Sequence, residues 1–299
     1  MNNHWPILSY EKAKDTYNTM HMWTQIAGKI KLAVHPWRNH SWHITLHSTP
    51  TGLSTLDMPY KGKHFQIDFD LINHKLKIVT SKGDLSEFNL QDLSVAEFYK
   101  KIFNALREMQ IDIKINTVPS EIQNPIPFEK DTVHKTYDKQ SANDLHQAVL
   151  SMKNVFTNFQ CDFKGKCSPV HFFWGSFDLA LSRFSGRKAP KHPGGIPNLP
   201  NWVAQEAYSH EVASCGFWPG NEAFPEAAFY AYVYPEPNQY KHAEIVPKEA
   251  FYQDTMREFI LPYKVVQQSD NPEGTLSSFI NSTYRAGAQL GEWDEVLEI

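Results

Sequence analysis

The sequence predicts an α+β protein with a mainly antiparallel sheet and helices packed on it. Segments with apolar residues three and four positions apart, typical of amphipathic helices, flank segments with alternating apolar residues, typical of half-buried strands. The strands also follow one another at hairpin spacing, which leaves no room for the crossover helices that a parallel sheet needs. In each half of the chain the predicted order of elements is helix, strands, helix, and this order suggests two similar halves.

The first helix is expected over residues 11–34, because its apolar residues share one helical face, and Pro36 ends it. The apolar residues of that face are Met20, Trp23, Ile26, Ile30 and Val34. Residues 41–48 then alternate between apolar and polar side chains. This period of two predicts a half-buried strand.

Residues 65–81 predict a β-hairpin with a two-residue turn at 73–74. This register places Asp70 opposite Lys77 on the polar face. Asp68 and Asp70 resemble a DxD metal or acid pair, but a cross-strand ion pair explains Asp70 without any function. The same register pairs apolar residues on the buried face, Leu71 with Leu76 and Phe69 with Ile78.

A capping box formed by Ser94 and Glu97 predicts the start of a second helix, and a short strand is expected at 111–115. Residues 117–140 contain three prolines and no periodicity, which indicates a linker or a long surface crossing. The expected organisation is therefore an N-terminal α+β half at 1–117, a linker at 118–140 and a C-terminal α+β half at 141–299.

The second half is expected to repeat this order of elements. If the halves are related by an internal duplication, the strand at 42–47 corresponds to the one at 170–175. Asn271 and Pro272 have the residue types that begin a final helix. The other elements expected in this half are a helix at 141–159 and strands at 170–174, 177–184, 228–234 and 258–266.

The composition indicates a globular protein, with 41% hydrophobic, 21% charged and 13% aromatic residues. A net charge of −4 and the lack of a recognised binding motif argue against nucleic acid as a partner. The three cysteines form no CxxC pair, which favours a reducing compartment. With neither a secretory signal nor a transmembrane segment in the sequence, we expect a cytoplasmic protein without membrane contact.

Several segments of the chain form a distinctive set: SPVHFFWGSFDLALSRFSGR, APKHPGG, EAYSHE, GFWPG and YPEP, and also WTQIAGKIKLA, IDFD and STYRAGAQL. Together they resemble a bacterial family of unknown function, DUF5996. It covers nearly the whole chain. It implies no activity, cofactor, substrate or site residue.

Residues 168–220 predict a pocket, because glycines, cations and aromatic residues gather there. We expect Arg183, Arg187 and His192 to bind a small anionic ligand, since guanidinium groups pair with carboxylates or phosphates and the following Gly-Gly turn exposes backbone amides. Trp174 and Trp218 would form walls of this pocket. The alternative for the basic residues is a solvated loop.

Catalysis in this pocket would use His171 or His210 as acid or base, because only histidine has an ordinary pKa near neutrality. A lower alternative is a metal-dependent hydrolase. Its candidate ligands are His192, Glu206 and His210, with Glu206 and His210 one helical turn apart if Asn201 begins a short helix.

A non-catalytic protein-interaction module also fits the aromatic and Pro-Gly surface. Cys215 is the best single candidate for a nucleophile, although burial of a free cysteine is the ordinary expectation. The sequence indicates neither a cofactor nor an oligomeric state.

Overall fold

The computed structural model describes residues 5–294. Its fold is built on two antiparallel sheets. The first sheet consists of β1 (His47–Thr49), β2 (Gly52–Ser54), β3 (Met58–Tyr60), β4 (Lys63–Asp70), β5 (Lys75–Thr80) and β6 (Leu85–Asn89). Its strands are joined in the order β1-β2-β4-β5-β6, and β3 also pairs with β4.

The second sheet contains the strands that position the candidate site. It consists of β7 (His171–Phe173), β8 (Asp178–Lys188), β9 (His210–Trp218), β10 (Ala228–Tyr234), β11 (Phe251–Gln253) and β12 (Glu258–Pro262), in the order β11-β12-β10-β9-β8-β7. The sheets meet where Leu46 pairs with Phe172 through two backbone hydrogen bonds of 2.8 Å each. The predicted α+β class and antiparallel pairing are confirmed.

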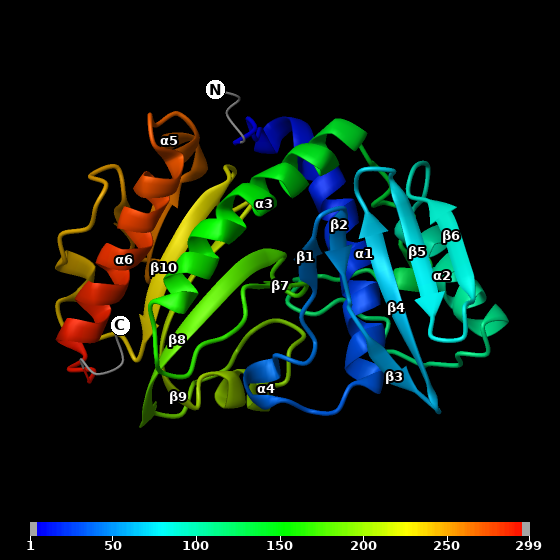
Figure 1. Cartoon of the computed structure of the whole chain (residues 1–299), viewed down its shortest axis with the longest axis horizontal. Helices are drawn as coiled ribbons and strands as arrows, with labels where there is room; N and C mark the ends of the chain where they lie inside the picture. The colour runs from blue at the N-terminus through cyan, green and yellow to red at the C-terminus, as the bar shows by residue number, and fades with distance from the viewer. Residues whose placement is uncertain (1–4, 295–299) are drawn as a thin grey trace.

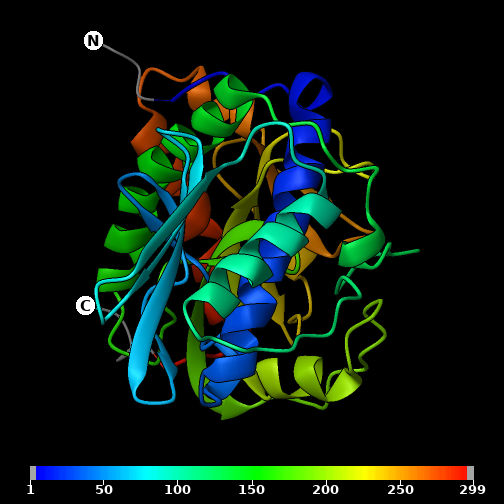
Figure 2. The same cartoon turned by 90° about the vertical axis from the view of Figure 1, so that its right-hand side faces the viewer.

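Helices cover the sheets on different sides. They are α1 (Tyr10–Val34), α2 (Val95–Glu108), α3 (Lys139–Cys161), α4 (Asn201–Ala207), α5 (Tyr263–Gln267) and α6 (Pro272–Leu290). Figure 1 shows α3 and α6 in front of the second sheet. In Figure 2, α1 and α2 lie against one face of the first sheet. Three short 3-10 turns, η1 (Asn39–Ser41), η2 (Phe128–Lys130) and η3 (Tyr240–His242), lie in the connections.

The local signals for helices are confirmed. The backbone N–H of Glu97 donates to the Ser94 hydroxyl and the backbone N–H of Ser94 donates to the Glu97 carboxylate, which is the predicted capping box. Helix α6 begins at Pro272, and the Asn271 side chain accepts a hydrogen bond from the Gly274 N–H. No helix within residues 5–294 combines the length and apolar character that a bilayer crossing needs. The cytoplasmic location stays a prediction.

The hairpin of β4 and β5 forms in a register that differs by two residues from the predicted one. Asp70 pairs with Lys75, and the connecting loop has four residues instead of two. The cause is the Asp70 carboxylate, which accepts hydrogen bonds from the backbone N–H groups of Ile72 and Asn73 and so stabilises the longer turn. Asp70 still forms the expected ion pair with Lys77, at 2.6 Å.

Three predicted strands are wrong in part or whole. Residues 41–45 form turns, and β1 begins only at His47. Ile111 and Ile113 are buried, but the segment 111–115 pairs with no described strand. The strand expected at 258–266 ends at Pro262, where α5 begins. Residues 41–45 and 111–115 alternate in burial without a partner strand, because sequence periodicity reports burial and not pairing.

The segment 117–140 packs along α1. The Gln25 side chain exchanges hydrogen bonds of 2.9 and 2.8 Å with the Ser120 backbone, and the Phe128 and Asp131 side chains are fully buried. This packing fixes the position of Glu121, which belongs to the candidate site. The division of the chain into two duplicated halves stays a prediction.

Candidate functional site

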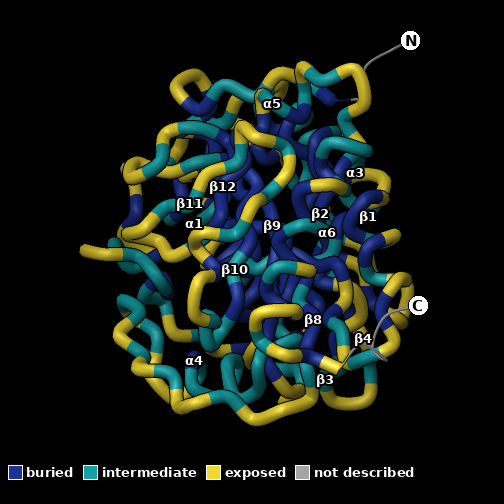
Figure 3. The backbone as a smooth tube through the Cα atoms, turned by 90° about the vertical axis from the view of Figure 1, so that its left-hand side faces the viewer, coloured by how far each residue is buried: buried dark blue, intermediate teal, exposed yellow. Residues whose placement is uncertain are grey.

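A cavity of about 200 Å³ lies on the face of the second sheet that α3 and α6 do not cover. Successive side chains of β8 point to opposite faces of the sheet. Arg183 points to α3 and α6, and the residues on the other face that line the cavity are Asp178, Ala180, Ser182 and Phe184. Figure 3 shows the largely buried strands β8, β9 and β10 between α3 on the right and α4 at the lower left. We call this space the sheet cavity. Its other lining residues come from the turn at His40–Ile44, from Phe173–Ser176, from α4 with its preceding loop, and from Glu121, Val212, Ser214, Tyr230 and Tyr232.

Asp178 is a buried carboxyl group at the sheet floor of the cavity, 7% exposed. The hydroxyl groups of Ser176 and Tyr230 each donate a hydrogen bond to it. Burial nevertheless raises its pKa, because the two hydrogen bonds only partly replace the water that an ionised carboxylate loses.

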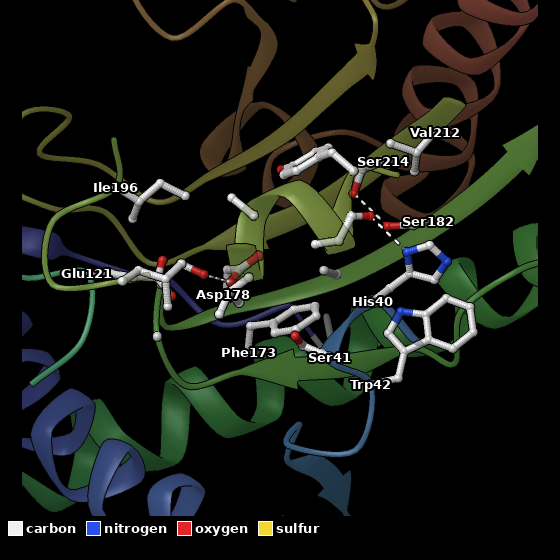
Figure 4. Close-up of a pocket in the computed structure, with 18 of the residues that line it drawn as sticks. His40, Ser41, Trp42, Glu121, Phe173, Asp178, Ser182, Ile196, Val212 and Ser214 are labelled. Atoms are coloured by element: carbon white, nitrogen blue, oxygen red, sulfur yellow. Dashed lines mark hydrogen bonds between the residues drawn. The ribbon is translucent and has the colours of Figure 1, made fainter. Parts of the chain in front are cut away.

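Glu121 reaches the same cavity from the crossing segment, as Figure 4 shows. Its backbone N–H donates to the Pro197 carbonyl oxygen at 2.9 Å, which holds the segment against the loop before α4. Glu121 is partly buried, and its carboxyl group has no hydrogen-bond partner among residues 5–294. Burial and, secondly, the charge of Asp178 raise the pKa of Glu121 to about 7.

Gly175 allows Glu121 to take this position. A Cβ atom on Gly175 would lie 1.9 Å from the Glu121 carboxyl oxygen Oε1, so any larger residue would displace the acid. Gly175 has an ordinary backbone conformation, and the reason for a glycine is therefore the close approach of the carboxyl group.

A third carboxyl group, Glu258, lies behind the tyrosines of the cavity. The β10–β12 register places it beside Tyr232, one residue beyond the Ala231–Phe259 pair. Burial and the charge of Asp178 raise the pKa of Glu258 to about 8. The hydroxyl groups of Tyr208 and Tyr232 form a hydrogen bond of 2.7 Å in front of it.

His40 forms the opposite wall in a left-handed backbone conformation, with φ of 56°. Its backbone N–H donates to the Glu206 carboxylate at 2.8 Å, and its ring Nδ1 lies 2.9 Å from the Ala207 carbonyl oxygen. The Lys166 ammonium lies 2.7 Å from Nε2. Burial lowers the pKa of His40, which fits a neutral ring that donates through Nδ1 and accepts from Lys166.

The three basic residues expected to bind an anion do not converge. The Arg183 guanidinium is buried on the other face of the sheet, 3.4 Å from the centroid of Phe159. Arg187 pairs with Glu211 at 2.7 Å and is 48% exposed. His192 stacks on Tyr208 with 4.7 Å between ring centroids and is not among the residues that line the cavity. The expectation of one basic pocket is therefore corrected, because strand alternation separates Arg183 from the loop.

The two histidines expected to act as acid or base lie outside the cavity lining. His171 is 1% exposed, and burial lowers its pKa to about 3. His210 begins β9 and contacts the Ser209 hydroxyl at 3.1 Å. Burial also raises the pKa of the Cys215 thiol, which makes it a poor nucleophile.

Of the two tryptophans expected as walls, only Trp174 lines the cavity, with its ring N–H donating to the Ile44 carbonyl oxygen at 2.9 Å. Trp218 packs on Tyr230 and Phe224 at the end of the sheet. Sequence reasoning missed Glu121 and Glu258. No local signal marks Glu121, whereas an acid within the apolar strand EFILP is a signal for Glu258.

The proposed metal ligands are also separated. Helix α4 ends at Ala207, so Glu206 and His210 do not share a helical face, and Glu206 binds the His40 backbone. Within residues 5–294 there is no group of three or more His, Cys, Asp or Glu side chains arranged to hold a metal ion.

A comparison with protein families shows which family the chain belongs to. The model of a family of unknown function (DUF5996) matches residues 5–298. The chain belongs to this family. No curated protein and no solved structure shows a significant match to this DUF5996 member. The family agrees with the resemblance noted in the sequence.

Proposed function

We propose that this protein binds a small organic molecule in the sheet cavity, and that the ligand is neutral or positively charged. The single observation that supports this most is the Glu121 carboxyl group. It is partly buried, is directed into the cavity and has no hydrogen-bond partner among the residues that the structure describes. A partly buried polar group without a protein partner is costly, and a ligand that donates hydrogen bonds to it would remove that cost.

The charges around the cavity disfavour the anionic ligand expected from the sequence. No Lys or Arg is among the residues that line the cavity, whereas two acids, Glu121 and Asp178, are. Lys166 contacts His40 and lies 5.4 Å from the ring centroids of Trp42 and Phe184, and Lys29 lies 5.9 Å from the ring centroid of Trp174. An anion would therefore meet two acids in the lining, with these cations behind the wall.

The remaining lining suits a small molecule with an apolar part and a polar part. Aromatic rings form one portion of the wall, among them Trp42, Phe173 and Trp174. Hydroxyl groups form another, including the Ser182–Ser214 pair at 3.0 Å, drawn in Figure 4. Small-molecule sites commonly combine a mostly apolar wall with a few polar groups that fix orientation.

The test is a thermal-shift screen with three sets of compounds of matched shape: amines, alcohols and carboxylates. We expect at least one amine or alcohol to raise Tm, and no carboxylate to do so. Glu121→Gln should weaken this effect. Glu129→Gln, on an exposed residue of the same crossing segment, is the matched control and should leave it unchanged. A shift by carboxylates alone would contradict the proposal.

A further inference from the structure

We infer that the ligand of the sheet cavity is an organic amine, whose ammonium group binds between the carboxyl groups of Glu121 and Asp178 and displaces protons from the acidic cluster that they form with Glu258. The inference rests on the proposed function and specifies its ligand. It concerns the same cavity, but it makes a separate statement about charge and proton exchange.

The first step is the placement of three acids from three different elements. Glu121 comes from the crossing segment, Asp178 from β8 and Glu258 from β12. Asp178 acts electrostatically on both glutamates. Buried acids that share a site remain neutral or acquire a cationic partner, because several negative charges in one enclosed space repel each other.

The second step is that two of these acids have no partner within residues 5–294. Neither the Glu121 nor the Glu258 carboxyl group accepts or donates a hydrogen bond there, whereas Asp178 is held by Ser176 and Tyr230. Carboxyl groups that are shielded from solvent are normally hydrogen-bonded. Because Glu121 lines the cavity without a partner, while Glu258 lies behind the lining, the partner of Glu121 is a molecule that enters that space.

The third step is that the protein's own cations near the cavity are already engaged. On α1, the Lys29 ammonium donates to the Val118 carbonyl oxygen and the Ser120 hydroxyl. The His21 ring contacts the Gly175 carbonyl oxygen and is not a cation, because burial lowers its pKa to about 4. At the other wall, Lys166 contacts His40. The remaining titratable groups that face the acids are the hydroxyls of Tyr208, Tyr230 and Tyr232. Their pKa values are raised by burial, and they stay neutral.

The fourth step is the aromatic wall. Trp42, Phe173, Trp174 and Tyr208 line the same cavity as the acids, and the faces of aromatic rings attract cations. A volume of about 200 Å³ accommodates a small metabolite. Acids combined with rings thus favour an ammonium group on a short apolar body over an alcohol of the same shape.

Proton balance follows directly from this arrangement. The amine enters as R–NH3⁺, a neutral carboxyl group of the cluster loses its proton to solvent, and the resulting carboxylate forms an ion pair with the ammonium group. No bond other than O–H breaks, and nothing is oxidised or reduced. Because Glu121 has a pKa of about 7, binding at neutral pH should release about half a proton or more per amine.

The experiment is calorimetric titration of the full-length protein with benzylamine, cyclohexylamine and butylamine at pH 7, in phosphate and in MOPS buffer, with the three matching alcohols as controls. For at least one amine we expect tighter binding than for its alcohol, and a binding enthalpy that differs between the buffers by the amount due to proton release. Glu121→Gln should weaken amine binding by about tenfold to a hundredfold and reduce the released protons. Glu129→Gln should change neither.

The outcomes separate the two proposals. If alcohols bind as tightly as amines and no protons are released, the cavity is a ligand site but the inference about amines is wrong. If neither class binds to wild-type protein that is shown to be folded by circular dichroism, both proposals are wrong. Amine binding that Glu121→Gln leaves unchanged, in a variant that retains the wild-type spectrum, would also overturn the inference.

Discussion

Arg183 is a cation whose surroundings are those of a core residue. It is 2% exposed, and its guanidinium lies 3.4 and 4.4 Å from the ring centroids of Phe159 and Tyr284. It also donates a hydrogen bond to the Phe159 carbonyl oxygen. Arg183 therefore joins α3 and α6 to β8, in contrast to Arg187, which forms a partly exposed ion pair with Glu211.

We predict that Arg183→Ala lowers the free energy of unfolding by about 3 kcal/mol, because it removes ring contacts and leaves a cavity. Arg187→Ala should cost less than about 1 kcal/mol, as partly exposed ion pairs usually do. Arg183→Met, which keeps most of the side-chain volume, should be milder than the alanine variant. Urea unfolding measures all three. Equal losses for Arg183→Ala and Arg187→Ala would contradict the structural role of Arg183.

Glu121 gives a pH-dependent prediction at the same scale. Its folded-state pKa of about 7 exceeds that of an unfolded glutamate, so the folded protein binds the extra proton between these values and stability falls as pH rises through this range. Glu121→Gln cannot lose a proton. Relative to wild type, its Tm should therefore rise progressively between pH 5 and pH 8. The difference in free energy of unfolding should grow by up to about 1.4 kcal/mol per pH unit. A difference that is the same at both pH values would contradict the enclosed position of the carboxyl group.

At the scale of elements, the contact between α1 and the end of β7 sets one wall of the cavity. Gly28 of α1 faces Trp174, and a Cβ atom on Gly28 would lie 2.2 Å from the indole ring. The helix thus approaches the second sheet closely enough for Trp174 to line the cavity and to bond to Ile44. A periodic helical pattern does not reveal this distance.

We predict that Gly28→Ala displaces Trp174, lowers Tm and weakens ligand binding, although alanine normally favours a helix. Ala27→Gly, at the preceding position of the same helix, serves as a control for helix propensity. It should lower Tm by removing a buried methyl group, while ligand affinity stays closer to that of wild type. Tryptophan fluorescence and the thermal-shift screen measure the two effects. Wild-type binding by Gly28→Ala would contradict the proposed wall.

The sequence predicted helices better than it predicted the site. Local signals such as the Ser94–Glu97 capping box and Asn271–Pro272 act within a few residues and can be seen in a single segment. The register of β4 and β5 depended on hydrogen bonds from the backbone to Asp70, which periodicity does not encode. The site depended on contacts across the chain: Glu121 and Asp178 are separated by 57 positions in sequence, and only the packing of the crossing segment brings them to one cavity.

At the scale of the whole molecule, buried histidines determine the response to acid. Burial lowers the pKa of His21 and His47 to about 4 and that of His171 to about 3. The unfolded chain binds protons at these rings near their ordinary pKa, whereas the folded chain does not. Above about pH 6.5 these rings therefore cost no free energy of unfolding. As pH decreases toward the folded-state pKa values, the free energy of unfolding falls.

We therefore predict that the wild-type protein loses stability between pH 6 and pH 4. His171→Asn cannot be protonated in this range, so its stability should fall less steeply with pH, even if its Tm at pH 7 is lower than that of wild type. Chemical unfolding at several pH values measures the slope. An unaltered slope for His171→Asn would contradict a neutral, buried ring.

The position of a bound amine tests the central claim most directly. A crystal structure of the protein grown with an excess of the amine that gives the largest thermal shift should show that molecule in the sheet cavity. Its nitrogen should lie within hydrogen-bond distance of the Glu121 carboxyl group, and its apolar part should contact Trp174 or Phe173. A well-ordered amine bound elsewhere, with the sheet cavity empty or filled by water, would contradict the account.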